Sequence, residues 1–146
     1  MTQIPSSQQN NPIAERGVDH FKRGETDAAF ACLSQAVEQQ SEDPRVYACL
    51  AFICAGQGLA REAENFISHA FRFAPGCHEY RAVLGESFLN AGNAAAAVRH
   101  LRLAVDAQPD LMAAYPALAE GYRRMLNEIW TKYTPAIVPD NYPRNP

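Results

Sequence analysis

The sequence has no long apolar run, no excess of basic residues and only a small net charge. None of its hydrophobic stretches approaches the roughly 18 apolar residues that a membrane-spanning helix needs. The net charge is −3, whereas a protein that binds the phosphate backbone of nucleic acid normally carries a basic patch and has a high pI. We therefore expect neither a membrane nor a nucleic acid as a partner.

The chain also lacks the patterns expected of an enzyme or a metal protein. Its glycines form no phosphate-binding loop, and no candidate nucleophile has a base at a supporting position. The four cysteines form no CxxC pair and match no structural zinc spacing; they are Cys32, Cys49, Cys54 and Cys77. We therefore predict a protein that is not an enzyme and that uses no metal and no cofactor.

The first residues, MTQIPSSQQNNP, contain no basic segment followed by an apolar one, which a secretory signal would need. We therefore expect a cytoplasmic protein, in which the reducing compartment keeps the cysteines as free thiols. His100 lies between Arg99 and Leu101 and close to Arg102, and we expect it on a solvated helix face. His20 is interpreted as a packing residue rather than an acid or base.

What the sequence does have is a repeat with a period of thirty-four residues. The period relates glycines (Gly24, Gly58, Gly92), alanines (Ala29, Ala63, Ala97 and Ala36, Ala70, Ala104) and larger apolar residues (Leu33, Ile67, Leu101). A period of this size that persists through three copies indicates stacked helical units. We therefore predict an all-α fold, an α-solenoid of antiparallel helix pairs.

Small residues at repeated positions suggest where the helices of each pair approach one another. Gly17, Ala51, Gly85 and Ala119 share one register on the first helices, and the repeated alanines supply the matching surface on the second helices. Larger side chains at such sites would overpack the contact, at a typical cost of about 1–3 kcal/mol. The glycines Gly24, Gly58 and Gly92 are predicted to lie in the turns, where a positive φ is often required.

The repeat divides the chain into an N-terminal disordered arm (1–9), three units (10–43, 44–77, 78–111), a capping helix (112–133) and a Pro-rich extended tail or linker (134–146). Asp43 before Pro44 is expected to cap a first helix, and Thr26 and Asn93 are expected to cap second helices. Pro116 either lies at the start of the capping helix or kinks it. The later apolar residues of this helix, among them Leu126 and Trp130, are expected to wrap onto the repeats.

The pattern resembles the tetratricopeptide repeat (TPR) family. The second unit carries it as Tyr47-x2-Leu50-Ala51-x2-Cys54, Ala63-x3-Ile67-x2-Ala70 and Pro75, and the third as Leu84-Gly85-x2-Phe88, Ala97-x3-Leu101-x2-Ala104 and Pro109. The stretch Tyr115-x2-Leu118-Ala119-x2-Tyr122 looks like the C-terminal capping helix of the family. The resemblance covers residues 10–133 and implies a right-handed superhelix whose concave groove is lined by the first helices.

The resemblance also implies which positions line that groove. Carried over to this sequence, the candidate partner-binding residues are Val18, Phe21, Arg45, Cys49, Phe52, Glu79, Val83, Glu86, Leu89, Asn90, Glu120 and Arg123. They form an apolar strip with charges of both signs around it, which suits a peptide or a partner helix. The alternative is that neighbouring helices or the tail cover Phe21, Phe52 and Leu89.

Three functions fit these patterns. The first is a non-enzymatic scaffold or adaptor that binds a peptide or helix of another protein in the groove. The second is an N-terminal TPR module of a larger bacterial enzyme, such as a glycosyltransferase or a methyltransferase. The third is a protein similar to type III secretion chaperones, and self-association is a further option.

Overall fold

The protein is all-α, as the periodicity predicts. The computed structural model describes residues 11–137, with side chains through residue 134. This range contains seven helices and no strand: α1 (Pro12–Lys22), α2 (Thr26–Glu38), α3 (Pro44–Gly56), α4 (Ala60–Phe73), α5 (Glu79–Asn90), α6 (Ala94–Ala107) and α7 (Ala114–Ile137). The predicted arm at residues 1–9 lies outside the described residues.

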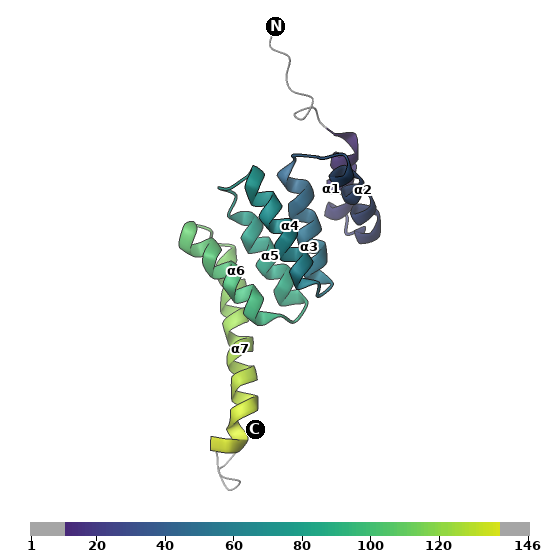
Figure 1. Cartoon of the computed structure of the whole chain (residues 1–146). Helices are drawn as coiled ribbons and strands as arrows, with labels where there is room; N and C mark the ends of the chain where they lie inside the picture. Colours follow the sequence, from purple (N-terminus) through teal and green to yellow (C-terminus); the bar gives the residue numbers. More distant parts are fainter. Residues whose placement is uncertain (1–10, 138–146) are drawn as a thin grey trace.

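The first six helices form three neighbouring pairs. Within each pair the two helices pack against each other, and α3 joins the first pair to the third through contacts with α1 and α5. The pairs lie next to one another in chain order, and α7 extends away from the last of them (Figure 1). The second helices begin at Thr26, Ala60 and Ala94, so the spacing of thirty-four residues in the sequence is also the spacing of the helix pairs.

The turn within each pair depends on a glycine. Gly24, Gly58 and Gly92 have φ angles of 76°, 78° and 85°. Residues with a Cβ rarely adopt this left-handed conformation, because the Cβ crowds the following carbonyl oxygen. The predicted role of these three glycines is therefore confirmed.

Polar side chains cap the N-termini of several helices. Asp43 Oδ1 accepts a hydrogen bond from the Arg45 N–H at 3.0 Å, and Asn93 Oδ1 accepts one from the Ala96 N–H at 3.1 Å. The prediction for Thr26 is wrong, because Thr26 is the first residue of α2 and its N-cap is Glu25, which makes no side-chain capping bond. Helix α2 instead begins two residues after the turn at Gly24, without a side-chain cap.

The small residues permit close contact within the pairs, as predicted. A Cβ added to Gly85 would lie 2.5 Å from Leu101 Cγ, and one added to Gly17 would lie 2.8 Å from Leu33 Cγ. The repeated alanines of the second helices are completely buried, including Ala63 and Ala97. This buried seam of small and branched residues is the core of each pair.

Ala119 does not belong to that seam, which corrects the sequence prediction. Ala119 is exposed, because no second helix follows α7 within residues 11–137 and α7 packs chiefly against α6. The close approach is made instead by Gly121, where an added Cβ would lie 2.7 Å from Val98 Cγ2. The position in the repeat predicted a small residue on α7 but assigned it to the wrong face.

Helix α7 begins at Ala114, so Pro116 lies in its first turn, where the backbone N–H has no partner within the helix and its loss is tolerated. The helix continues to Ile137, four residues beyond the predicted boundary at 133, so the expectation of an extended segment fails for residues 134–137. The remainder of the predicted tail lies outside the described residues. Contrary to prediction, α7 does not wrap onto the repeats, since Leu126 and Trp130 are 65% and 66% exposed.

Candidate functional site

The predicted site lies on the face formed by α1, α3 and α5, which is called here the first-helix face. These three helices are neighbours, because α3 packs against both α1 and α5. A row of aromatic rings crosses them: Phe21 lies 5.9 Å from Phe52, and Phe52 lies 6.4 Å from Tyr80, measured between ring centroids. The packing of first helices against one another therefore brings together residues from all three units.

Several predicted groove residues are part of the core rather than the surface. Phe52 and Leu89 are only 8% and 6% exposed, and Val18 and Cys49 are also buried. Phe52 lies between the rings of Phe21 and Tyr80. For Phe52 and Leu89 the structure therefore favours the alternative that neighbouring helices cover them.

Other predicted residues are exposed and share one side of α5. Glu79, Val83, Glu86 and Asn90 follow one another at intervals of four, three and four residues, which places them on one helix face, and all four are exposed. Among the described residues, neither Glu79 nor Glu86 takes part in an ion pair. The exposed face of α5 is therefore apolar at its centre and acidic on both sides.

Tyr80 was not predicted as a site residue, yet it joins this exposed side of α5 to the aromatic row. Its ring is half-buried against Phe52, and burial is the main cause that raises the pKa of its hydroxyl to about 12. Phe21 at the other end of the row is also half-buried. No repeat position marks Tyr80, because the corresponding residue of the second unit is Val46, which is buried.

Arg45 connects the first two units at one end of the face. Its guanidinium donates to Glu15 Oε1 at 2.5 Å and to Asp43 Oδ2 at 2.7 Å. The hydrogen bonds to Asp43 and to Glu15 raise the pKa of Arg45 above its usual value. Because both carboxylates lie beside the guanidinium, Arg45 is occupied in holding α1 to α3.

Glu120 and Arg123 lie on α7 and interact with each other. Arg123 Nη2 donates to Glu120 Oε1 at 2.7 Å, and Arg124 Nε donates to the same oxygen at 2.8 Å. These hydrogen bonds, first from Arg123 and then from Arg124, lower the pKa of Glu120 to about 2. Arg124 also donates to the carbonyl oxygen of Leu89 at 2.8 Å, so this charged cluster helps to fix α7 on α5.

The reactive residue types on the face are poorly placed for catalysis. Burial is the main cause that raises the pKa of the Cys49 thiol to about 11, so the thiol stays protonated and weakly nucleophilic at neutral pH. Within the described part of the chain, no three His, Cys, Asp or Glu residues are grouped so that they could hold a metal ion.

His100 differs from the prediction of a solvated residue. It is 3% exposed, its ring stacks on Phe88 with centroids 5.6 Å apart, and its Nε2 lies 2.6 Å from Glu64 Oε1. Burial is the main cause that lowers the pKa of the imidazole. His100 therefore links α6 to α4 as a neutral packing residue. Its neighbours Arg99 and Arg102 had wrongly suggested that this part of α6 faces solvent.

Comparison with models of known protein families finds no match, and comparison with curated proteins finds none either. The resemblance to the TPR family therefore depends on the residues of this chain alone. Among the described residues, no helix combines the length and apolar character needed to cross a membrane.

Proposed function

We propose that this protein is a non-enzymatic interaction module of the TPR kind that binds a peptide or helix of another protein on the first-helix face. The observation that carries the proposal is the exposed side of α5, where Val83 lies between Glu79 and Glu86. Tyr80 and Phe21 extend this apolar surface along the aromatic row. The predicted groove residue Phe52 is buried between these two rings and supports that surface.

The charges on α5 suggest the chemistry of the partner segment. Two carboxylates without an ion pair beside an apolar residue favour a ligand that carries Lys or Arg next to an apolar side chain. Exposed ion pairs are worth only about 0.2–1 kcal/mol each, so most of the affinity would come from apolar contact and the charges would select the ligand. A segment that ends in carboxylates would be repelled.

A peptide-display library tests this proposal without knowledge of the natural partner. We expect the wild-type protein to select peptides with a basic residue beside an apolar one. The double variant Glu79→Lys, Glu86→Lys should instead select acidic peptides, because it reverses the charge of the α5 surface. The matched control is Glu38→Lys, Glu62→Lys, which makes the same change of net charge at exposed positions of α2 and α4.

The control should keep the wild-type preference, and circular dichroism should show that both variants are folded. If the α5 variant keeps the wild-type preference, or if the control variant changes it equally, the first-helix face is not the binding site. Selection of no peptide at all would shift support to the reading of this chain as a structural module of a larger enzyme.

A further inference from the structure

The second half of α7 carries a stripe of apolar residues that nothing in the described chain covers. Tyr122, Leu126, Ile129 and Tyr133 are spaced by four, three and four residues, and Trp130 lies beside them. These five residues are called here the α7 stripe. All five are exposed, with Ile129 at 52% and Trp130 at 66%.

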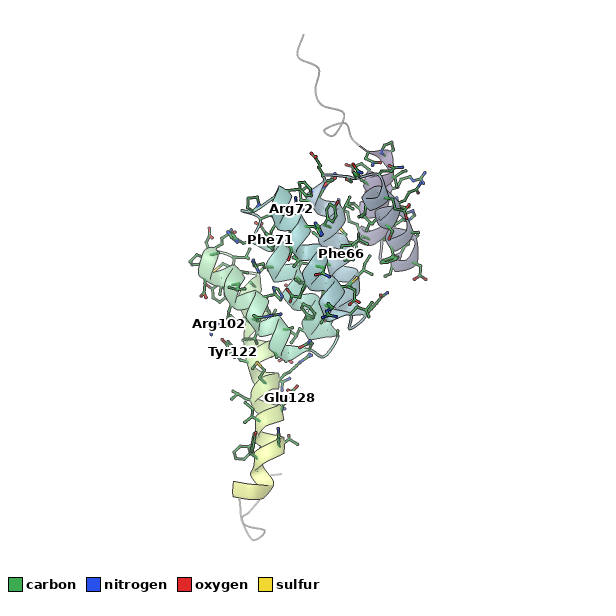
Figure 2. The ribbon with its side chains drawn as sticks, viewed as in Figure 1. Phe66, Phe71, Arg72, Arg102, Tyr122 and Glu128 are labelled. Atoms are coloured by element: carbon green, nitrogen blue, oxygen red, sulfur yellow. The ribbon has the colours of Figure 1, made fainter. Side chains whose placement is uncertain are left out.

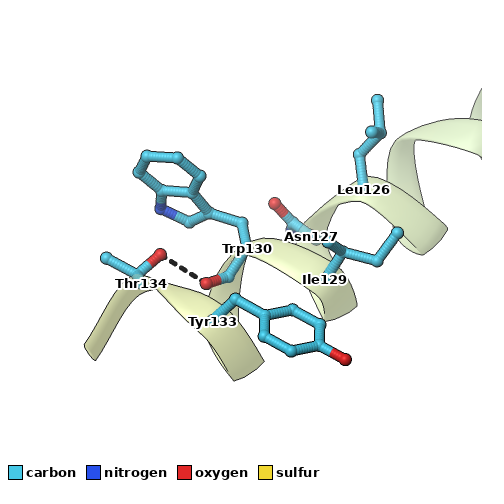
Figure 3. Close-up of a pocket in the computed structure, with 6 residues that line it drawn as sticks. All are labelled: Leu126, Asn127, Ile129, Trp130, Tyr133 and Thr134. Carbon is cyan, nitrogen blue, oxygen red and sulfur yellow. Dashed lines mark hydrogen bonds between the residues drawn. The ribbon is translucent and has the colours of Figure 1, made fainter. Parts of the chain in front are cut away.

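The stripe lies on the part of α7 that extends beyond the helix pairs (Figure 1). Figure 2 places Tyr122 where α7 passes α6, and Glu128 further along the free part of the helix. A hollow of about 370 Å³ lies between the stripe side chains and is lined by residues from Leu126 to Thr134. In Figure 3 the rings of Trp130 and Tyr133 border this hollow, with the Thr134 hydroxyl bonded to the backbone of Trp130.

The spacing of the stripe is that of a helix that packs along another helix. At 100° per residue, the five side chains fall within an arc of about 100°. Alternating steps of four and three residues are the heptad pattern, in which the a and d positions face a partner helix. The opposite side of α7 is polar in this region and includes Arg124 and Glu128.

We propose that the α7 stripe binds a second copy of this chain, with the two α7 helices antiparallel. In this arrangement Leu126 of each copy packs against Ile129 of the other, and Tyr122 packs against Tyr133. The helix pairs lie at the N-terminal end of α7 (Figure 1). Antiparallel contact therefore places the two bodies at opposite ends of the interface, whereas parallel contact would crowd them together at one end.

The exposed area is sufficient for such a dimer. From the exposed fractions of the five residues, and with aromatic side chains of roughly 150–250 Å² each, the stripe presents on the order of 500 Å². Two copies would remove about 1,000 Å² from water, which reaches the lower size limit of specific interfaces. A patch of this size matches the largest apolar patch of a typical monomer, which is often functional.

The charges beside the stripe fit the antiparallel arrangement. Arg123 lies on the side of the stripe where Trp130 projects, and Lys132 lies on the other side, near Met125. In the antiparallel dimer Arg123 faces Trp130 of the second copy, which permits a cation–π contact, and Lys132 faces Met125. No like charges meet across the interface, so the stripe is complementary to itself.

The dimer would leave the first-helix face free, because the stripe is on α7 and the face is formed by α1, α3 and α5. Two binding faces on one dimer would increase the apparent affinity for a partner that carries two copies of the recognised segment. The dimer itself does not depend on the proposed peptide binding.

The first test is the molar mass in solution, measured by light scattering and by sedimentation velocity over a range of concentrations. We expect the wild-type chain to show twice the mass of 16.1 kDa, with a dissociation constant on the order of micromolar. Leu126→Lys with Ile129→Lys should weaken the dimer by about a hundredfold or more, because it buries unpaired charge. A control with one such change is Leu103→Lys, at a 46% exposed position of α6, and it should remain dimeric.

Both residues are exposed in the monomer, so their variants should keep the wild-type circular dichroism. At concentrations below the dissociation constant, where the wild type is also monomeric, they should keep its melting temperature. A wild-type chain that stays monomeric at all concentrations overturns the proposal and leaves the stripe to residues 138–146 or to a different protein. A dimer that survives the Leu126→Lys, Ile129→Lys change would also overturn it, since the interface would then lie elsewhere.

The second test is disulfide crosslinking, which fixes the orientation. Tyr122 and Tyr133 are eleven residues apart, or about 17 Å along the helix. In a background with Cys32→Ser and Cys77→Ser, an equal mixture of the Tyr122→Cys and Tyr133→Cys variants should crosslink on oxidation, whereas each variant alone should not. Crosslinking of either variant with itself would indicate parallel helices and refute the antiparallel contact.

Discussion

Replacement of Gly85 by alanine tests the contact on which the helix pairs depend. The added Cβ would lie 2.5 Å from Leu101 Cγ, 3.1 Å from the Ala97 carbonyl oxygen and 3.2 Å from Leu101 Cδ1. The Leu101 side chain is completely buried, and protein interiors are packed densely enough that a displaced side chain rarely finds free space. The carbonyl oxygen belongs to the backbone of α6, so relief of that contact requires the two helices to move apart.

The expected magnitude follows from two opposing terms. Overpacking of a buried contact costs about 1–3 kcal/mol, while alanine in a helix interior is favoured over glycine by about 1 kcal/mol. Since both a side chain and a backbone atom are crowded, we expect the upper part of the first range. The net loss in the free energy of unfolding is then about 1–2 kcal/mol, which corresponds to a fall in melting temperature of about 3–8 °C.

Thermal and urea denaturation followed by circular dichroism would measure this loss. The control is Gly56→Ala at the last residue of α3, where an added Cβ meets nothing within 4 Å, and it should be neutral or slightly stabilising. The second unit already combines Ala51 with Ile67 at the corresponding positions, so Leu101→Ile should reduce the cost of Gly85→Ala. A Gly85→Ala protein as stable as wild type, or strictly additive effects of the two changes, would refute the reasoning.

Two further predictions concern other buried contacts. Ala63→Leu should destabilise the protein by about 1–3 kcal/mol through overpacking of a fully buried site; an unchanged melting temperature would contradict the proposed register. For His100, the lowered pKa means that the unfolded chain binds the proton more readily. The stability due to neutral His100 is therefore present above about pH 6.5 and is lost as the pH falls below it, so the difference in stability between wild type and His100→Gln should shrink between pH 7.5 and 5.5; a difference that does not change with pH would contradict this.

The sequence predicted the helices better than it predicted the site. The repeat placed the turn glycines and the buried alanines correctly, because a position that must be small or must have a positive φ accepts few residue types. The candidate groove was predicted from positions alone, and Phe52 and Leu89 turned out to be buried. Whether an apolar side chain at such a position is exposed depends on the neighbouring rings, which belong to other units.

The last helix shows the same limit. The period predicted Ala119 as the small contact residue, but the contact is made by Gly121, because within the described residues α7 packs chiefly against α6. The apolar residues after Tyr122 could equally well be interpreted as residues that fold back onto the repeats. The sequence shows that these apolar residues recur at helical spacing, but it does not show whether they pack against the repeats or stay exposed.

Thus the sequence by itself determined the all-α class, the length of the repeat and the turns, since these follow from local backbone requirements and from contacts within one unit. Tertiary structure alone decided which apolar residues stay exposed, that His100 is neutral and buried, and that α7 extends away from the body. These properties depend on how neighbouring units shield one another from water, and that shielding is set by packing between helices far apart in the chain.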